Sequence, residues 1–235
     1  MWTWASDYLQ KYMEWKKMTE KKPVRAAVLV SGGGTNLQAL IDEEKRMKEA
    51  GEFCPYTIAL VISSSKNAYA LERAAAAGIK AEIASAYAVM GKEVAIAATR
   101  EEKNAACSDR VLELCRENEI EIIVYAGYLT VLQGEIIREY ANRMINLHPA
   151  LLPKFGGVGM WGHHVHEAVL AAGEKESGCT VHLVNEVCDG GEILIQKKVP
   201  VMPDDTPDTL YARIAPHEHE AMIEGVKLLA NRLIG

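Results

Sequence analysis

A short apolar run that ends in three glycines constrains the fold of this chain more than any other segment. Val24–Val30 is rich in β-branched and other apolar residues, and Ser31-Gly32-Gly33-Gly34 follows it directly. Apolar residues then recur at helical spacing through residues 36–50. This pattern predicts a buried strand, a tight turn and a helix, which together form the first unit of an α/β sheet.

The alternation of strand and helix continues along the chain. Further strands are predicted over residues 57–63, 80–84, 120–126 and 143–147, and further helices over residues 67–77, 101–118, 132–140 and 206–233. Strands joined by helices at this spacing form right-handed crossovers in a parallel sheet. Residues 179–185 and 193–199 flank Asp189-Gly190-Gly191 and read as an antiparallel pair. We therefore expect an open, mostly parallel, twisted sheet of the Rossmann type, with helices on both faces and antiparallel strands near the C-terminus.

The N-terminal segment differs from the rest of the chain. Residues 2–18 predict an amphipathic helix, so we divide the chain into a helical extension over residues 1–22 and one domain over residues 23–235. The aromatic stripe of this helix consists of Trp4, Tyr8, Tyr12 and Trp15. Packing against the domain or a partner subunit is favoured over a membrane-surface anchor, because Asp7 and Glu14 dilute the positive charge.

Charge and cysteine content exclude several classes of protein. The formal net charge of −6 argues against a nucleic-acid partner, which calls for a basic surplus. The five cysteines form no CxxC pair, which favours reduced thiols and a cytoplasmic location. No stretch approaches the roughly 18 consecutive apolar residues of a membrane span. Nothing in the sequence decides the oligomeric state, so a homodimer stays open.

The glycine-rich turn is the first candidate site. Backbone N–H groups of such a turn, together with the N-terminus of the helix that follows, suit a phosphate. The turn lacks the Lys-Ser/Thr pair of a P-loop, and Leu37 stands where the dinucleotide pattern has its third glycine. A sugar phosphate or mononucleotide is therefore favoured over a dinucleotide or triphosphate, and a plain strand-to-helix turn is the alternative.

Two further candidate sites lie at strand ends. Asn146 and His148 are two apart in a predicted strand, so their side chains share one side of it, where they could stabilise an oxyanion and move a proton. A buried, hydrogen-bonded histidine is the alternative. Asp189 near His148 would raise the pKa of the imidazole and fix its tautomer. A plain hairpin turn at Asp189 is the reading that spacing alone favours.

Two groups of histidines could suggest a metal. His163, His164 and His166 are too close together for structural zinc spacing, and no acid or thiol is paired with them. His217 and His219 are two apart in a predicted helix and do not share a face. We expect no metal site.

Three segments in this order resemble one enzyme family. AAVLVSGGGTNLQALID, INLHPALLPKF and GCTVHLVNEVCDGGEILIQKKVPV are similar to the phosphoribosylglycinamide formyltransferases of purine biosynthesis, and the resemblance runs from Val24 to the C-terminus. It implies a one-carbon transferase that moves the formyl group of 10-formyltetrahydrofolate, as co-substrate, to the amine of glycinamide ribonucleotide, without a metal.

The resemblance also implies roles for individual residues. The catalytic trio would be Asn146, His148 and Asp189. The ribonucleotide would be held by Gly34, Thr35, Asn36 and Glu218. The folate would lie against Leu129, Thr130, Val131, Leu132, Asn146, Asn185, Glu186, Val187, Cys188 and Asp189. The chain departs from the family pattern at Thr130 and Ala215, and its loop over residues 155–162 is long and glycine-rich, as expected of a lid.

The implied mechanism is direct transfer without a covalent enzyme intermediate. The amine attacks the formyl carbon, and Asn146 and protonated His148 stabilise the oxyanion. Asp189 holds His148 charged and oriented. The alternatives are a formyltetrahydrofolate hydrolase, a methionyl-tRNA formyltransferase and a non-catalytic sensor on the same fold. The hydrolase normally has a regulatory domain before the first strand, whereas only 23 residues precede that strand here.

Overall fold

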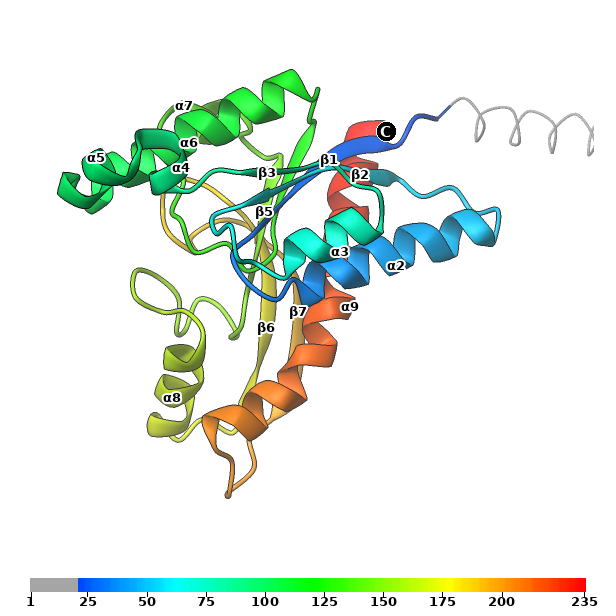
Figure 1. Cartoon of the computed structure of the whole chain (residues 1–235). Coiled ribbons are helices and arrows are strands. Elements are labelled where there is room, and N and C mark those ends of the chain that lie inside the picture. The colour runs from blue at the N-terminus through cyan, green and yellow to red at the C-terminus, as the bar shows by residue number, and fades with distance from the viewer. Residues whose placement is uncertain (1–20) are drawn as a thin grey trace, which may run out of the picture.

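The computed structural model describes residues 21–235, which form one seven-stranded sheet with helices on both faces (Figure 1). The strand order is β3-β2-β1-β4-β5-β6-β7. The strands are β1 (Val24–Val30), β2 (Tyr56–Ser63), β3 (Ala81–Ile83), β4 (Ile122–Tyr125), β5 (Met144–His148), β6 (Glu176–Leu183) and β7 (Ile193–Pro200).

The pairing of the strands confirms the predicted architecture. β3, β2, β1, β4 and β5 are parallel, whereas β6 pairs with β5 and β7 pairs with β6 in antiparallel fashion. β2 and β3 lie on one side of β1, and the chain then crosses to the other side of β1, where β4 pairs with it. Ligands of such sheets bind at the carboxyl ends of the strands where the direction of winding changes, which lies beside β1 and β4 here.

Two cores lie on opposite faces of the sheet. Alternate residues of β1 point to different cores, with Val28 in one and Leu29 in the other, so this strand is buried on both sides. The helices that cover the sheet are α2 (Thr35–Glu49), α3 (Ala70–Ala76), α4 (Ala86–Met90), α5 (Lys92–Ala97), α6 (Arg100–Glu117), α7 (Glu135–Glu139), α8 (His163–Ala171) and α9 (Pro207–Ile234).

The predicted helices differ from the observed ones in several places. The helices predicted from residues 67 and 132 begin only at Ala70 and Glu135. The sequence pattern indicated nothing at α4 and α5, which are too short for a repeating apolar face. Local capping explains them, because the Ser85 side chain accepts a hydrogen bond from the N–H of Ala88, and Gly91, at φ 80°, separates the two helices.

The helix predicted over residues 2–18 lies outside the described residues, so the division at residue 22 stays a prediction. Within residues 21–235, no helix is both long and apolar enough to cross a membrane.

Candidate active site

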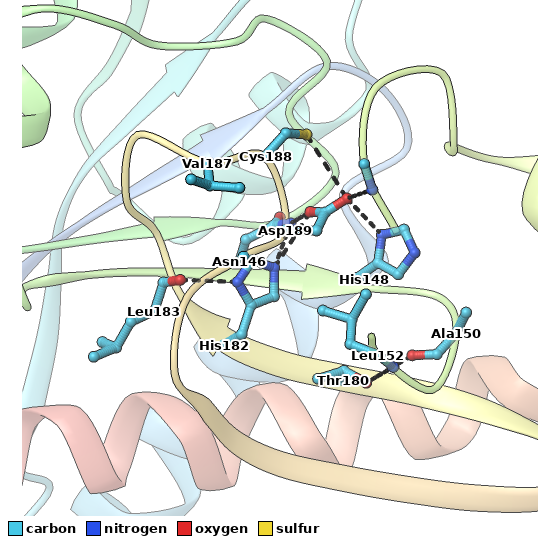
Figure 2. A network of polar contacts seen from close by, with 12 residues as sticks. Asn146, His148, Ala150, Leu152, Thr180, His182, Leu183, Val187, Cys188 and Asp189 are labelled. Carbon is cyan, nitrogen blue, oxygen red and sulfur yellow. Dashed lines mark hydrogen bonds and ion pairs between the residues drawn. The ribbon is translucent and has the colours of Figure 1, made fainter. Parts of the chain in front are cut away.

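The site is built at the carboxyl end of β5, where Asn146 and His148 lie on the same side of the strand. In the register between β5 and β6, Asn146 stands opposite His182 and His148 opposite Thr180. Asp189 reaches the same place from the loop between β6 and β7 (Figure 2). The three residues expected to form a catalytic trio therefore come together.

Asp189 contacts all the other polar side chains of this cluster. Its Oδ2 atom lies 3.5 Å from Nδ1 of His148, and its Oδ1 atom lies 3.4 Å from Nε2 of His182. The Asn146 amide donates to the same Oδ1 over 3.4 Å. The His148 and Asp189 side chains are only 4% and 9% exposed, so water screens their interaction weakly.

The loop that follows β5 closes over this cluster. The Phe155 carbonyl accepts a hydrogen bond from Nε2 of His148 at 2.7 Å, and the Gly157 N–H donates to Oδ2 of Asp189 at 2.9 Å. A Cβ at Gly156 would stand 2.5 Å from a methyl carbon of Leu152 and 3.3 Å from Cβ of Asp189. Glycine at this position therefore lets the loop approach both reactive groups.

The charges of the cluster follow from burial and from these contacts. Burial lowers the pKa of His148 below its usual value and outweighs the raising effects of Asp189 and of the Phe155 carbonyl. Asp189 raises this pKa, as expected, but burial favours the neutral ring over the charged one. Burial also opposes ionisation of Asp189. The pKa of Asp189 nevertheless lies below its usual value, because His182 and the Gly157 N–H donate hydrogen bonds to the carboxylate and the nearby imidazoles of His148 and His182 favour its charge.

His182 is a member of the cluster that the sequence analysis missed. Its Nδ1 atom donates to the Leu183 carbonyl at 2.8 Å, and its Nε2 atom lies 3.2 Å from the Asn146 amide nitrogen and 3.4 Å from Oδ1 of Asp189. His182 thereby orients both Asn146 and Asp189. The sequence signal was its place in an alternating strand, and only the pairing of that strand with β5 identifies its neighbours.

The glycine-rich turn lies between the end of β1 and the N-terminus of α2. Gly34 has a φ of 70°, and a Cβ there would stand 2.6 Å from Cβ of Ala70, so only glycine fits. Thr35 is exposed, whereas Asn36 is only 8% exposed and its Oδ1 atom has no partner within the described part of the chain.

Glu218 of α9 lies beside Asn36. Its side chain is buried, and burial raises the pKa of its carboxyl to about 7 against a hydrogen bond from Asn36. Glu218 and Asn36, two of the four residues expected to hold the ribonucleotide, are thus neighbours.

The two segments expected to hold the folate differ in exposure. Leu129 and Val131 are exposed and Thr130 is half-buried, but Leu132 is 5% exposed and belongs to the core. The Leu129 N–H donates to the Ser31 hydroxyl at 2.9 Å, which ties this segment to the glycine-rich turn. In the second segment the exposed residues are Asn185, Glu186, Val187 and Cys188.

No group of three or more His, Cys, Asp or Glu side chains in residues 21–235 could hold a metal ion. His166 is buried and its Nδ1 atom has no partner among these residues, whereas the side chains of His163 and His164 are 60% exposed.

Comparison with known proteins gives one consistent family. The family model described as formyl transferase matches residues 24–226. The phosphoribosylglycinamide formyltransferase of Escherichia coli (strain K12) is 36% identical over 195 residues, which are 82% of this chain and 80% of that protein. The trifunctional purine biosynthetic protein adenosine-3 of Drosophila melanogaster is 38% identical over 92% of this chain, but the chain spans only 14% of its length.

Solved structures agree with this assignment. The glycinamide ribonucleotide transformylase 1 of Symbiobacterium toebii has a TM-score of 0.76 and 33% identity, with 89% of each chain covered. The phosphoribosylglycinamide formyltransferase of Brucella melitensis has a TM-score of 0.73 and 37% identity, and the match covers 89% of this chain and 96% of that one.

Proposed function

The chain belongs to the formyl transferase family, in its phosphoribosylglycinamide formyltransferase branch, and we propose that it formylates the amine of glycinamide ribonucleotide in purine biosynthesis. The formyl donor is folate-dependent in this family, and we infer that it is 10-formyltetrahydrofolate. The observation that carries the proposal is the buried contact between His148 and Asp189, beside Asn146.

The proposal assigns the two substrates to the two sides of this cluster. The phosphate of the ribonucleotide lies against Gly34, Thr35 and Asn36, where the N-terminus of α2 favours an anion. Glu218 contacts the ribonucleotide from α9. The folate lies against the segments 129–132 and 185–189, with the formyl group at Asn146.

The chemistry follows from the charge of His148 in the resting site. Because burial lowers its pKa, the ring is neutral at neutral pH and able to accept a proton. The amine nitrogen forms a bond to the formyl carbon, the carbonyl oxygen becomes an oxyanion, and the nitrogen passes a proton to His148. The imidazolium and the Asn146 amide then stabilise the oxyanion, with Asp189 balancing the new positive charge.

Collapse of the tetrahedral intermediate completes the transfer. The oxyanion re-forms the carbonyl, the bond from carbon to the folate nitrogen breaks, and that nitrogen receives the proton from His148. The neutral ring is restored, so the cycle needs no covalent enzyme intermediate. His182 is a positioning residue in this scheme, because it contacts Asn146 and Asp189.

A spectrophotometric assay tests the proposal. The full chain is mixed with glycinamide ribonucleotide and 10-formyltetrahydrofolate, and release of the deformylated folate is followed with and without the ribonucleotide. Release that depends on the ribonucleotide supports the transferase. Release without it supports the formyltetrahydrofolate hydrolase, and no release in either tube contradicts both.

Other features of the protein stay proposals. We infer a cytoplasmic location from the reduced cysteines, and small-molecule substrates without a nucleic-acid partner from the acidic net charge.

A further inference from the structure

Arg73 of α3 is bound to the glycine-rich turn although it lies in another helix. Its Nε atom donates to the Gly33 carbonyl at 2.8 Å, and Nη1 donates to the Gln38 side chain of α2 at 2.9 Å. Its guanidinium carbon lies 5.0 Å from the centre of the Tyr69 ring. Three contacts to a planar, permanently charged group fix its orientation, which a lysine could not reproduce.

The start of α3 also holds the preceding carbonyl of the turn. The Ala70 N–H donates to the Gly32 carbonyl at 3.1 Å, so two consecutive carbonyls, those of Gly32 and Gly33, point toward α3. In a trans peptide the C=O and N–H groups point in opposite directions. The N–H groups of Gly33 and Gly34 therefore point away from α3.

The following residues continue this array of donors. Gly34, in the left-handed region, leads into the first turn of α2, whose N–H groups lack partners within the helix. Successive N–H groups around a left-handed residue form a concave anion site.

A second observation points to a ligand here. Asn36, in the first turn of α2, is more than nine-tenths buried, and its Oδ1 atom has no partner among the described residues. Buried polar atoms are nearly always hydrogen-bonded, so a ligand that donates to this oxygen, such as a hydroxyl group of a sugar phosphate, would complete this site.

We propose that Arg73 is a positioning residue for the substrate phosphate: it holds the Gly33 carbonyl so that the turn presents its N–H groups, and it places a positive charge beside them. This inference rests on the proposed function, since the phosphate is that of the ribonucleotide. It assigns to α3 a role in recognising the phosphate and not the reacting amine or the folate.

Binding of ribose 5-phosphate to the full chain tests the inference independently of catalysis. Titration calorimetry compares the wild type with Arg73→Ala, Arg73→Lys and the control Arg46→Ala, which removes an exposed arginine paired with Glu43 and Glu52 elsewhere on α2. We expect Arg73→Ala to bind about tenfold more weakly, since it loses a charge-assisted contact to the turn. Arg73→Lys should lie between it and the wild type, and Arg46→Ala should match the wild type.

A second readout separates positioning from a loss of structure. In Arg73→Ala the KM for glycinamide ribonucleotide should rise about tenfold, whereas kcat and the KM for the folate stay within about twofold. The melting temperature of the ligand-free protein should stay close to that of the wild type.

Two results would overturn the inference. One is equal ribose 5-phosphate affinity in Arg73→Ala and the wild type, or no ribose 5-phosphate binding by the wild type. The other is an equal loss of folate and phosphate binding, which indicates general disruption. If ribose 5-phosphate binding depends on Arg73 while no formyl transfer is detected, the proposed reaction fails and the phosphate site stands.

Discussion

The Nδ1 atom of His148, at the end of β5, lies 3.5 Å from the Oδ2 atom of Asp189, which reaches it from the loop after β6. The other ring nitrogen of His148 donates to the Phe155 carbonyl, so the imidazole is held between two acceptors. Both acceptors favour the charged ring, and burial favours the neutral one. A histidine balanced in this way can gain and lose a proton within one reaction cycle.

Replacement of His148 tests its part in the transfer. We expect His148→Ala to lower kcat about a thousandfold, because the amine loses its proton acceptor and the oxyanion loses a positive charge. Ribonucleotide binding should persist, since the glycine-rich turn is untouched. Steady-state kinetics and titration calorimetry measure both, with His164→Ala, an exposed histidine of α8, as the control. A His148→Ala enzyme as active as the control removes His148 from the mechanism.

The pH dependence of kcat/KM tests the protonation state of His148. The neutral ring accepts the proton, so activity should fall as the pH drops through the pKa of His148, below the usual 6.5. Asp189 raises that pKa, so Asp189→Asn should shift the acid limb to lower pH and also reduce kcat. Rates across the pH range in both proteins measure this. An acid limb that moves upward in the variant contradicts the assignment.

Glu218 should contribute to ribonucleotide binding while it lowers the free energy of unfolding at neutral and alkaline pH. Burial raises the pKa of Glu218 from 4.5 to about 7. The protonated carboxyl therefore contributes fully to the stability of the folded state below pH 4.5, and this contribution is lost as the pH rises through 7. At pH 8 we expect Glu218→Gln to raise the free energy of unfolding by about 3 kcal/mol, and at pH 4 by almost nothing. Ribonucleotide affinity should fall in the same variant. Urea unfolding at the two pH values measures the effect, and an equal change at both contradicts this account.

His166 should make the protein sensitive to acid. Burial, with the charges of His163 and His148, lowers its pKa from 6.5 to about 4. The stability that depends on the neutral ring is present above pH 6.5 and is lost as the pH falls toward 4. When the pH is lowered from 7 to 4.5, the free energy of unfolding should fall by about 2 kcal/mol more in the wild type than in His166→Gln. Urea unfolding measures it, with His164→Gln as the control. A pH-independent difference would show that His166 does not carry the effect.

The sequence predicted those parts of the fold and site that depend on neighbours along the chain. Alternation within a strand was enough to put Asn146 and His148 on one side of β5, and the apolar run with its glycines was enough to predict β1 and the turn. Asp189 shows the limit of local reasoning, because spacing alone favoured a plain turn there. The residue does have the positive φ of a turn, at 55°, and its carboxylate also reaches the site.

Other parts depend on contacts that a single strand does not contain. His182 joins the cluster only because β6 pairs with β5 in one register. The charge of His148 depends on how deeply the assembled loops bury it. Arg73 reaches the glycine-rich turn only because α3 begins beside it.

The most direct test of the central claim follows the formyl carbon itself. The full chain is mixed with glycinamide ribonucleotide and one equivalent of 10-formyltetrahydrofolate carrying a ¹³C-labelled formyl group, and mass spectrometry locates the label after a single turnover. The account predicts that all of the label appears on the amine of the ribonucleotide, in amounts equal to the folate released, with none on the protein. Label in free formate, or bound covalently to the protein, would contradict it.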